Sequence, residues 1–187
     1  ELYVPIFNQL GYNCFIAEYR GYSMSSGQPG LVKMLNDVHF IIEAINQPIN
    51  NLILFGRSVG SIYAIHAANN YPEIPGLIIE SGIADIMDRL LLRIHPEEIG
   101  ATFEEMHTAV KCDFNHQEKL SKFRGASLIM HTMGDSLINY LHGENLYDWA
   151  PEPKVLKLFE RGDHNTIFFT NSDEYKKTIL RFLSKFD

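Results

Sequence analysis

Short, nearly continuous apolar runs alternate along the chain with longer stretches in which apolar positions recur every three to four residues. The apolar runs cover residues 13–19, 51–55, 76–80, 126–131 and 154–159. They do not alternate with polar residues, which is typical of strands covered on both faces. The stretches with helical spacing cover residues 31–46, 58–70, 138–149 and 172–186. Strands that alternate with helices predict an α/β fold, with a mostly parallel sheet flanked by helices.

One segment interrupts this alternation. Residues 82–124 contain two or three short helical patterns, such as the apolar positions Ile86, Leu90 and Ile94, and no convincing strand. An excursion of this length between two strands of a compact domain is typical of a functional lid or cap, with an ordinary surface insertion as the alternative. We therefore expect residues 1–187 to form a single domain with a small helical cap insertion at about 83–123.

Composition excludes several classes of protein. The net charge of −7 and the absence of a Lys/Arg cluster argue against a nucleic-acid partner. No apolar run reaches the ~18 residues that a transmembrane segment needs. No signal peptide is visible, which favours a cytoplasmic location, although the chain begins at Glu1 and any upstream targeting segment is outside the sequence.

Cysteine and histidine usage gives no sign of a disulfide framework, a metal or a cofactor. The two cysteines, Cys14 and Cys112, are too few for a disulfide-stapled fold. Cys14 lies in an apolar run, so we expect it to be a packed free thiol. The eight histidines show no metal-ligand spacing such as HExxH.

The stretch "ILFGRSVGSIYA", residues 53–64, places a serine between a predicted strand and a predicted helix. Gly56, Ser58 and Gly60 form the pattern G-x-S-x-G, the nucleophile elbow. The turn is so tight that the serine takes strained backbone geometry, and we expect side chains at either glycine position to collide with the strand or the helix. The serine oxygen would then stand above the sheet at a helix N-terminus, where developing negative charge is favoured. The alternative is a serine that only caps the helix.

A serine nucleophile needs a general base, and the base needs an orienting carboxylate. Ligands bind beyond the carboxyl ends of parallel strands, so residues that directly follow strands are the candidates. Asp135 follows the predicted strand 126–131, and His164 follows the strand 154–159. The order Ser, Asp, His is the one expected for a nucleophile elbow of this kind. Ser58, Asp135 and His164 are therefore the predicted catalytic residues.

Other carboxylates and histidines fit less well. Asp163 adjoins His164, and neighbours in sequence rarely aim their side chains at each other, whereas Asp148 and Asp113 lie in a helix pattern and in the predicted cap. His131 ends a strand and could support the acid loop as a structural hydrogen-bonding residue. His66 is predicted to be packed or solvated. The other histidines have no strand-end context: His39, His95, His107, His116 and His142.

Five stretches together resemble serine hydrolases of the α/β-hydrolase superfamily, in particular the small esterase-like and thioesterase-like branch that includes protein depalmitoylases. They are "LGYNCFIAEYRGYSMSSG" (10–27), "FGRSVGS" (55–61), "IIESGIADIMD" (78–88), "LIMHTMGDSLI" (128–138) and "RGDHNTIF" (161–168). Family members typically read "DYRGYGxSxG" in the first stretch, so Glu18 and Ser23 depart from the pattern. Thr132 stands where a glycine is usual, which would stiffen the acid loop without removing the acid.

The resemblance implies an α/β-hydrolase fold and an acyl-enzyme mechanism. The backbone N–H of Val59 would supply one oxyanion donor, and a second would come from a loop after an earlier strand, which has no counterpart here. In the family's sheet an earlier strand lies between the nucleophile strand and the strand matched by residues 13–19, and residues 1–10 match the helix after that earlier strand. We therefore expect the 187 residues to be part of a longer polypeptide.

The leading functional hypothesis is a hydrolase of carboxylic esters or thioesters that needs no metal or cofactor. The apolar helix pattern at residues 86–94 could wall an acyl pocket, so a small-molecule or acyl substrate is expected. A peptidase of the same fold is one alternative. A catalytically inactive scaffold used for binding is the other.

Overall fold

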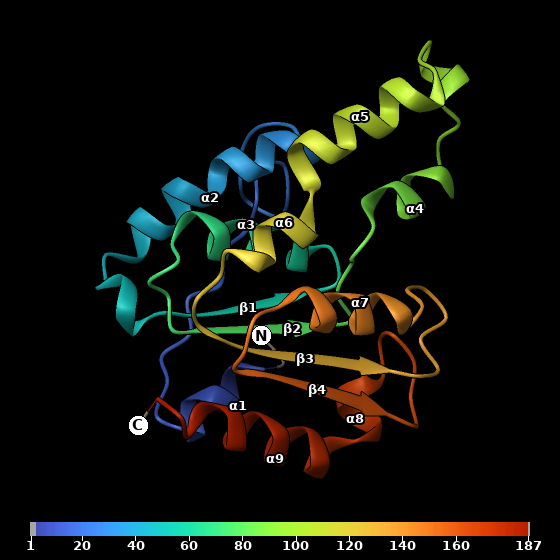
Figure 1. The fold of residues 1–187 in the computed structure, drawn as a ribbon. Helices are drawn as coiled ribbons and strands as arrows, with labels where there is room; N and C mark the ends of the chain where they lie inside the picture. Colours follow the sequence, from blue (N-terminus) through green and yellow to red (C-terminus); the bar gives the residue numbers. More distant parts are fainter. Residues whose placement is uncertain (1–2, 187) are drawn as a thin grey trace.

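The sheet at the centre of the protein has four parallel strands. The computed structural model describes residues 3–186. The strands are β1 (Ile53–Arg57), β2 (Gly76–Glu80), β3 (Ala126–Thr132) and β4 (Lys154–Phe159). They lie in the order β1-β2-β3-β4, each parallel to its neighbour (Figure 1). This arrangement confirms the predicted fold class, and four of the five predicted strands are present within one or two residues of their expected bounds.

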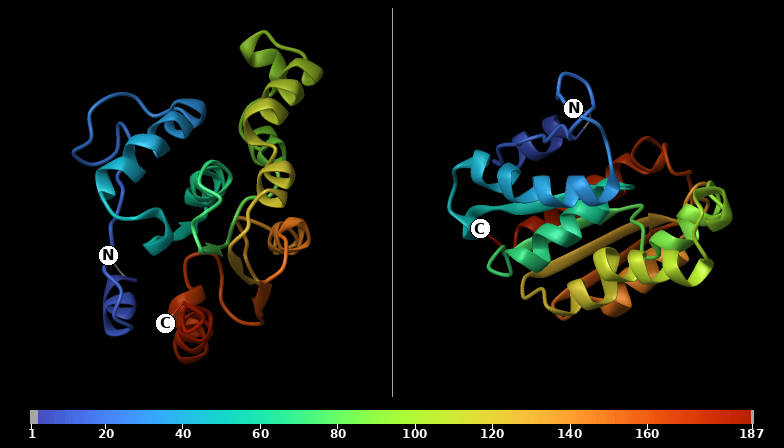
Figure 2. Two further views of the ribbon diagram at one scale, coloured as in Figure 1. Left: turned by 60° about the vertical axis from the view of Figure 1, so that its left-hand side comes forward. Right: turned by 90° about the horizontal axis from the view of Figure 1, so that it is seen from above.

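Helices cover both faces of the sheet (Figures 1 and 2). One face carries α2 (Leu31–Ile45), α3 (Gly60–Asn70), α6 (His116–Ser121) and α7 (Leu141–Trp149). The other carries α1 (Val4–Gln9), α8 (Ile167–Thr170) and α9 (Ser172–Leu183). Neighbouring strand residues divide between two cores: Leu77 and Ile79 pack with α2 and α3, whereas Ile78 packs with α9. The two central strands, β2 and β3, are buried at every position, and most of their residues are apolar.

Residues 13–19 do not form the predicted strand. They make no ladder with any strand among the described residues, and Phe15 and Ile16 are 55% and 56% exposed. Cys14 is exposed, so the expectation of a packed thiol is wrong. An apolar run becomes a strand only where a neighbour takes up its backbone N–H and C=O groups. The segment instead rests on the helical layer through Tyr19, whose ring lies 4.5 Å from that of Tyr63. The longer polypeptide stays a prediction.

Two predicted helices begin later than their patterns suggest. α3 begins at Gly60, because Ser58 is taken up by the turn after β1. α7 begins at Leu141 rather than at residue 138, because residues 135–138 wrap around a carboxylate. In that turn the backbone N–H groups of Leu137 and Ile138 donate to Asp135.

The connection between β2 and β3 is helical, as expected for residues 83–123. It contains α4 (Ile86–Leu91), a 3-10 helix (Pro96–Ile99), α5 (Phe103–Phe114) and α6. α4 and α5 project away from the sheet, whereas α6 returns and packs against α3 (Figure 1). A short 3-10 helix, Ile49–Asn51, precedes β1. The role of the projecting part as a cap stays a prediction. None of the helices in residues 3–186 is long and apolar enough to cross a membrane.

Candidate active site

Ser58 sits in a strained turn directly after β1. Its φ of 51° lies in the left-handed region, which costs free energy in a residue with a side chain and is typical of functional sites. The backbone N–H of Ser58 donates to the carbonyl of Glu80 at 2.9 Å, which fixes the turn to the end of β2. In this turn the Ser58 side chain contacts His164 and lines a pocket.

The two glycines of the elbow have different reasons to be glycine. A Cβ on Gly56 would lie 2.6 Å from the Cβ of Ala64 and 2.8 Å from the Gly60 carbonyl oxygen, closer than packed atoms allow. The expectation that a side chain at Gly60 would also collide is wrong. A Cβ there would meet no heavy atom within 4 Å among the described residues, because the first turn of α3 leaves that side open. Only the first glycine is required by packing.

The three residues predicted to be catalytic meet at the carboxyl ends of β1, β3 and β4. His164 Nε2 lies 3.0 Å from the Ser58 hydroxyl oxygen, and His164 Nδ1 lies 2.8 Å from Asp135 Oδ2. An ionised carboxylate only accepts hydrogen bonds, so Nδ1 carries the proton and Nε2 is left as an acceptor for the hydroxyl. The imidazole is buried, at 5% side-chain exposure, while the pocket beside Ser58 is open to solvent. This is the arrangement that a general base for Ser58 requires.

The Asp135 carboxylate is held from several sides. Oδ1 accepts from the backbone N–H groups of Leu137 and Ile138 at 2.9 and 2.7 Å, and Oδ2 lies 3.2 Å from His131 Nε2. Burial raises the pKa of Asp135, but the hydrogen bonds from His131, His164 and Ile138 outweigh it and hold that pKa well below the usual range. Asp135 is therefore a fixed negative charge at neutral pH.

His131 lies under the acid loop, where the sequence suggested a structural role. Its Nε2 also lies 2.9 Å from the Ile138 carbonyl oxygen, and its side chain is fully buried. Asp163, the weaker acid candidate, is turned away from the His164 ring. Its carboxylate accepts from the Ser136 N–H at 2.7 Å and from the backbone N–H of His164, so it ties the acid loop to the histidine loop.

A network beside Ser58 was not foreseen from the sequence. Arg57 donates from Nε to Glu80 at 2.8 Å and from its terminal nitrogen to the His164 carbonyl at 2.6 Å. Glu80 is fully buried and also accepts hydrogen bonds from the hydroxyls of Tyr3 and Tyr175. Burial and the Glu80 charge raise the pKa of both tyrosines, so their protons stay in place. Arg57 and Glu80 are the last residues of β1 and β2, and they lie opposite each other in the sheet. Their pairing can be recognised only when it is known that β1 and β2 are neighbours.

The hydroxyl of Ser58 opens onto a pocket of about 280 Å³. Aliphatic side chains from the elbow, from α4 and from the acid loop form most of its wall, among them Ile62, Ile86 and Leu137. The backbone N–H of Val59, the predicted oxyanion donor, has no hydrogen-bond partner within residues 3–186. It is thus free to donate a hydrogen bond to a bound ligand. A second oxyanion donor stays a prediction.

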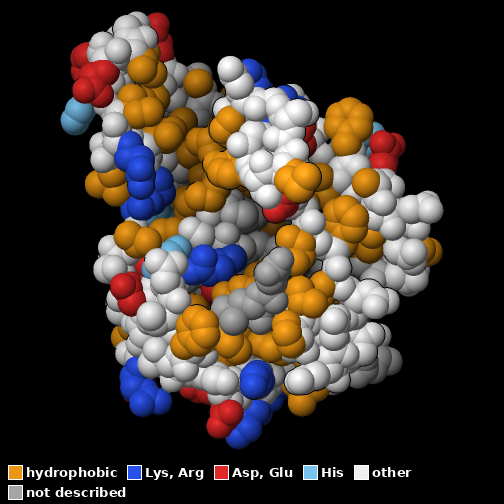
Figure 3. Space-filling view, turned by 180° about the vertical axis from the view of Figure 1, so that it is seen from behind, with side chains coloured by type: hydrophobic (Ala, Val, Ile, Leu, Met, Phe, Trp, Pro, Cys, Tyr) orange, Lys and Arg blue, Asp and Glu red, His pale blue; other side chains and the backbone are white. Residues whose placement is uncertain are grey.

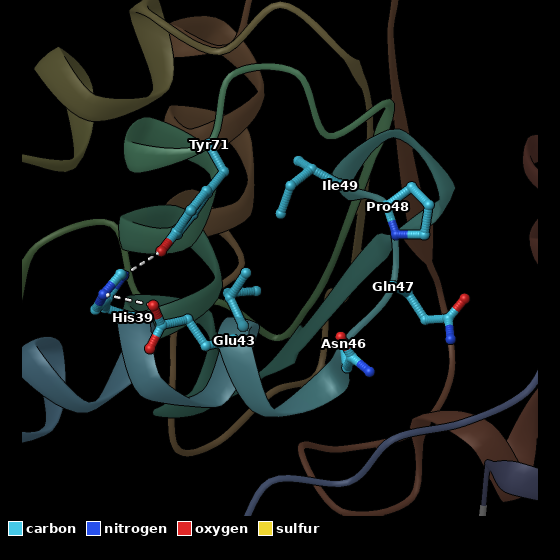
Figure 4. A pocket seen from close by; sticks show the side chains of 8 residues that line it. His39, Glu43, Asn46, Gln47, Pro48, Ile49 and Tyr71 are labelled. Atoms are coloured by element: carbon cyan, nitrogen blue, oxygen red, sulfur yellow. Dashed lines mark hydrogen bonds and ion pairs between the residues drawn. The ribbon is translucent and has the colours of Figure 1, made fainter.

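A second pocket, of about 480 Å³, lies at the opposite end of β1. It is formed by the end of α2, the 3-10 helix before β1 and the end of α3 (Figure 4). The His39 ring lies between the Tyr71 hydroxyl and the Glu43 carboxylate, at 2.7 and 3.2 Å. Ligands of open α/β sheets bind at the carboxyl ends of the strands, so the pocket beside Ser58 is the candidate active site.

Comparison with known proteins agrees with the fold. The chain superposes on the putative non-heme bromoperoxidase BpoC from Mycobacterium tuberculosis H37Rv with a TM-score of 0.75 at 14% identity, over 98% of this chain and 85% of that one. A meta-cleavage product hydrolase from Pseudomonas fluorescens IP01 gives 0.72 at 14% identity, over 100% and 84%. The fold is thus that of an α/β hydrolase. Residues 3–103, just over half of the chain, match the family described as serine aminopeptidase, S33, and the chain belongs to that family.

The curated relatives of this chain are only about a quarter identical to it in sequence. The uncharacterised protein YfhR of Escherichia coli O157:H7 is 27% identical over 92% of this chain and 60% of its own length. The alpha/beta hydrolase domain-containing protein 17C of Mus musculus is 25% identical over 98% of this chain and 54% of its own length. The chain therefore spans a little more than half the length of these relatives.

Proposed function

We propose that the protein is a serine hydrolase that cleaves a carboxylic ester or thioester through an acyl-enzyme. The observation that carries the proposal is the continuous chain of hydrogen bonds from the Ser58 hydroxyl through His164 to Asp135. A serine that only caps a helix would not need a strained backbone, a buried imidazole at 3.0 Å and an orienting carboxylate behind it.

In the first half of the reaction the Ser58 oxygen attacks the acyl carbonyl while His164 Nε2 takes the hydroxyl proton. Asp135 stabilises the imidazolium that forms, and the Val59 N–H donates to the oxyanion. His164 then returns the proton to the departing alcohol or thiol. In the second half His164 takes a proton from a water molecule, the resulting hydroxide attacks the acyl carbon, and Ser58 recovers its proton as the acid leaves.

The pocket favours an acyl substrate. Its wall beside Ser58 is mostly aliphatic, so it removes the hydrocarbon part of an acyl group from water. Proteins of similar fold include a monoacylglycerol lipase from Paleococcus ferrophilus and an esterase from Exiguobacterium antarcticum, with TM-scores of 0.61 and 0.63. Both names describe ester cleavage by those two proteins, which is compatible with the proposal for this chain.

The description of the matched family favours a second candidate, a peptidase of the same fold. The same serine, histidine and carboxylate can attack an amide carbonyl, with His164 protonating the departing amine. Acyl p-nitrophenyl esters and amino-acid p-nitroanilides separate the two, because a peptidase hydrolyses the anilides whereas an esterase hydrolyses only the esters.

Labelling with a fluorophosphonate probe tests the proposal directly. The intact protein should be labelled at Ser58 and should hydrolyse p-nitrophenyl esters, and Ser58→Ala should lose both while its thermal unfolding stays unchanged. Ser121→Ala, on the exposed end of α6, is the matched control and should behave as wild type. Unlabelled wild-type protein that folds normally would instead support the inactive binding scaffold.

A further inference from the structure

Two arginines line the pocket beside Ser58. Arg89, in α4, and Arg93, just after it, are the only lining side chains besides Ser58 and His164 that are not aliphatic among the residues described. No acidic side chain lines this pocket. The chain as a whole carries a net charge of −7, so the charge of this pocket lining is opposite in sign to that of the whole protein. Figure 3 shows basic side chains beside hydrophobic ones on the flank where α4 and α5 project.

Neither arginine is neutralised within the described part of the chain. No hydrogen bond or ion pair joins Arg89 or Arg93 to another side chain of residues 3–186. The nearby acids are occupied elsewhere. Asp85 accepts from a backbone N–H at the start of α4, and Asp88 lies 3.3 Å from His142 Nε2.

Arg89 belongs to α4, whereas Arg93 lies in the turn after this helix, where its backbone N–H donates to the Leu90 carbonyl. Both side chains line the same pocket. Two guanidinium groups that line one largely aliphatic pocket can bind an anion, because their planar N–H groups match the oxygens of a carboxylate or phosphate. By contrast, Arg57 on the other side of Ser58 is fully engaged with Glu80 and the His164 loop.

We infer that the substrate of this site is an acyl ester or thioester that also carries an anionic group, a carboxylate or a phosphate, which Arg89 and Arg93 bind while the hydrocarbon part packs on the aliphatic wall. The inference rests on the proposed hydrolase function and narrows its substrate class. The anion can belong to the acyl part or to the leaving group, and the two sources are separated by experiment.

Two matched pairs of esters test the inference. The first pair is the p-nitrophenyl monoester of a dicarboxylic acid and the p-nitrophenyl ester of a monocarboxylic acid of equal chain length. The second is a monoacylglycerol phosphate and the monoacylglycerol with the same acyl chain. In at least one pair kcat/KM should favour the anionic member about 10-fold or more, the factor that one charge-assisted hydrogen bond supplies. The pair that shows the preference identifies where the anion lies.

The double variant Arg89→Gln with Arg93→Gln should bring that ratio of kcat/KM values close to one. The double variant Lys176→Gln with Lys177→Gln changes the net charge equally on α9, across the sheet, and should leave the ratio as in wild type. Equal kcat/KM values within both pairs, or a preference that survives loss of both arginines, would overturn the inference while leaving the hydrolase intact.

Binding provides a readout that does not depend on turnover. Octyl phosphate should bind to the Ser58→Ala protein in calorimetry more tightly than octanol, and the two arginine substitutions should remove the difference. If no ester is hydrolysed and no probe labels Ser58, the proposed function fails, and octyl phosphate binding alone decides the anion site. Octyl phosphate that binds no better than octanol would then refute it.

Discussion

The guanidinium of Arg57 joins the loop of His164 to the strand that carries Ser58. Arg57 directly precedes Ser58, and it donates a hydrogen bond of 2.6 Å to the backbone carbonyl of His164. The same guanidinium is held by Glu80, whose carboxylate is buried and accepts from two tyrosine hydroxyls. The proposed general base, His164, and the proposed nucleophile, Ser58, are therefore tied to the same guanidinium group, although they lie 106 positions apart in the chain. Arg57 is a positioning residue in the proposed reaction.

Replacing Arg57 with lysine should separate positioning from stability. A lysine ammonium can still pair with the Glu80 carboxylate, but it has no planar fork to reach Glu80 and the His164 carbonyl together. We expect kcat for ester hydrolysis to fall about 10- to 100-fold in Arg57→Lys, with KM changed far less, because a misplaced base costs rate more than binding. Urea unfolding should remain close to that of wild type.

Arg57→Met provides the comparison, since it leaves the buried Glu80 charge unpaired and should lower the free energy of unfolding by about 3–5 kcal/mol. If Arg57→Lys keeps the kcat of wild type, the hydrogen bond to His164 has no role in positioning the base.

Asp135→Asn should reduce kcat by about 10³- to 10⁴-fold, because an amide does not hold the proton on His164 Nδ1 and does not stabilise the imidazolium. Labelling by a fluorophosphonate should become slower without being abolished. Asp163→Asn is the matched control, since Asp163 binds backbone and Ser136 groups rather than the imidazole ring. A larger loss of kcat in Asp163→Asn than in Asp135→Asn would reverse the assignment of the acid.

The pattern of apolar residues predicts the two central strands well because β2 and β3 are buried at every position. The outer strands β1 and β4 are only partly buried, and β4 contains Lys154 and Lys157, but both keep enough apolar residues to be found. Residues 13–19 have the same pattern and form no strand, since the pattern does not reveal whether a neighbouring strand is present. Ser58, Asp135 and His164 could be selected because each follows a strand. The link between Arg57 and Glu80 could not, because it depends on β1 lying beside β2 in a particular register.

The two glycines of the elbow offer a paired test of packing. Gly56→Ala should lower the free energy of unfolding by about 1–3 kcal/mol, the usual cost of an added methyl group in a filled space. Gly60→Ala should change it by no more than about 0.5 kcal/mol, because the new methyl group meets open space at the start of α3. Urea unfolding of both variants measures the difference. Equal destabilisation would mean that the turn, rather than the contact with Ala64, requires glycine at both positions.

His116, at the start of α6, is a buried titratable group outside the active site. Its Nδ1 donates to the Ile83 carbonyl at 2.9 Å, and its Nε2 is buried without a partner among the described residues. Burial, with a smaller effect of the nearby Lys119 charge, lowers the pKa of His116 to about 4, although the Ile83 and Ala84 carbonyls and Asp85 act in the opposite direction. The folded protein therefore keeps this imidazole neutral where the unfolded chain protonates it.

This difference predicts how stability changes with pH. Between the ordinary pKa of 6.5 and the folded value of about 4 the unfolded chain binds more protons at His116, so the free energy of unfolding falls as the pH is lowered. From pH 7.5 to pH 5 the contribution of His116 amounts to a loss of about 2 kcal/mol. His116→Asn keeps a donor for the Ile83 carbonyl but does not titrate, so its loss over this range should be smaller by that amount. His107→Asn, at an exposed position of α5, should retain the pH dependence of wild type, and urea unfolding at both pH values measures all three proteins. The same pH dependence in His116→Asn as in wild type would show that His116 is protonated in the folded protein as easily as in the unfolded chain.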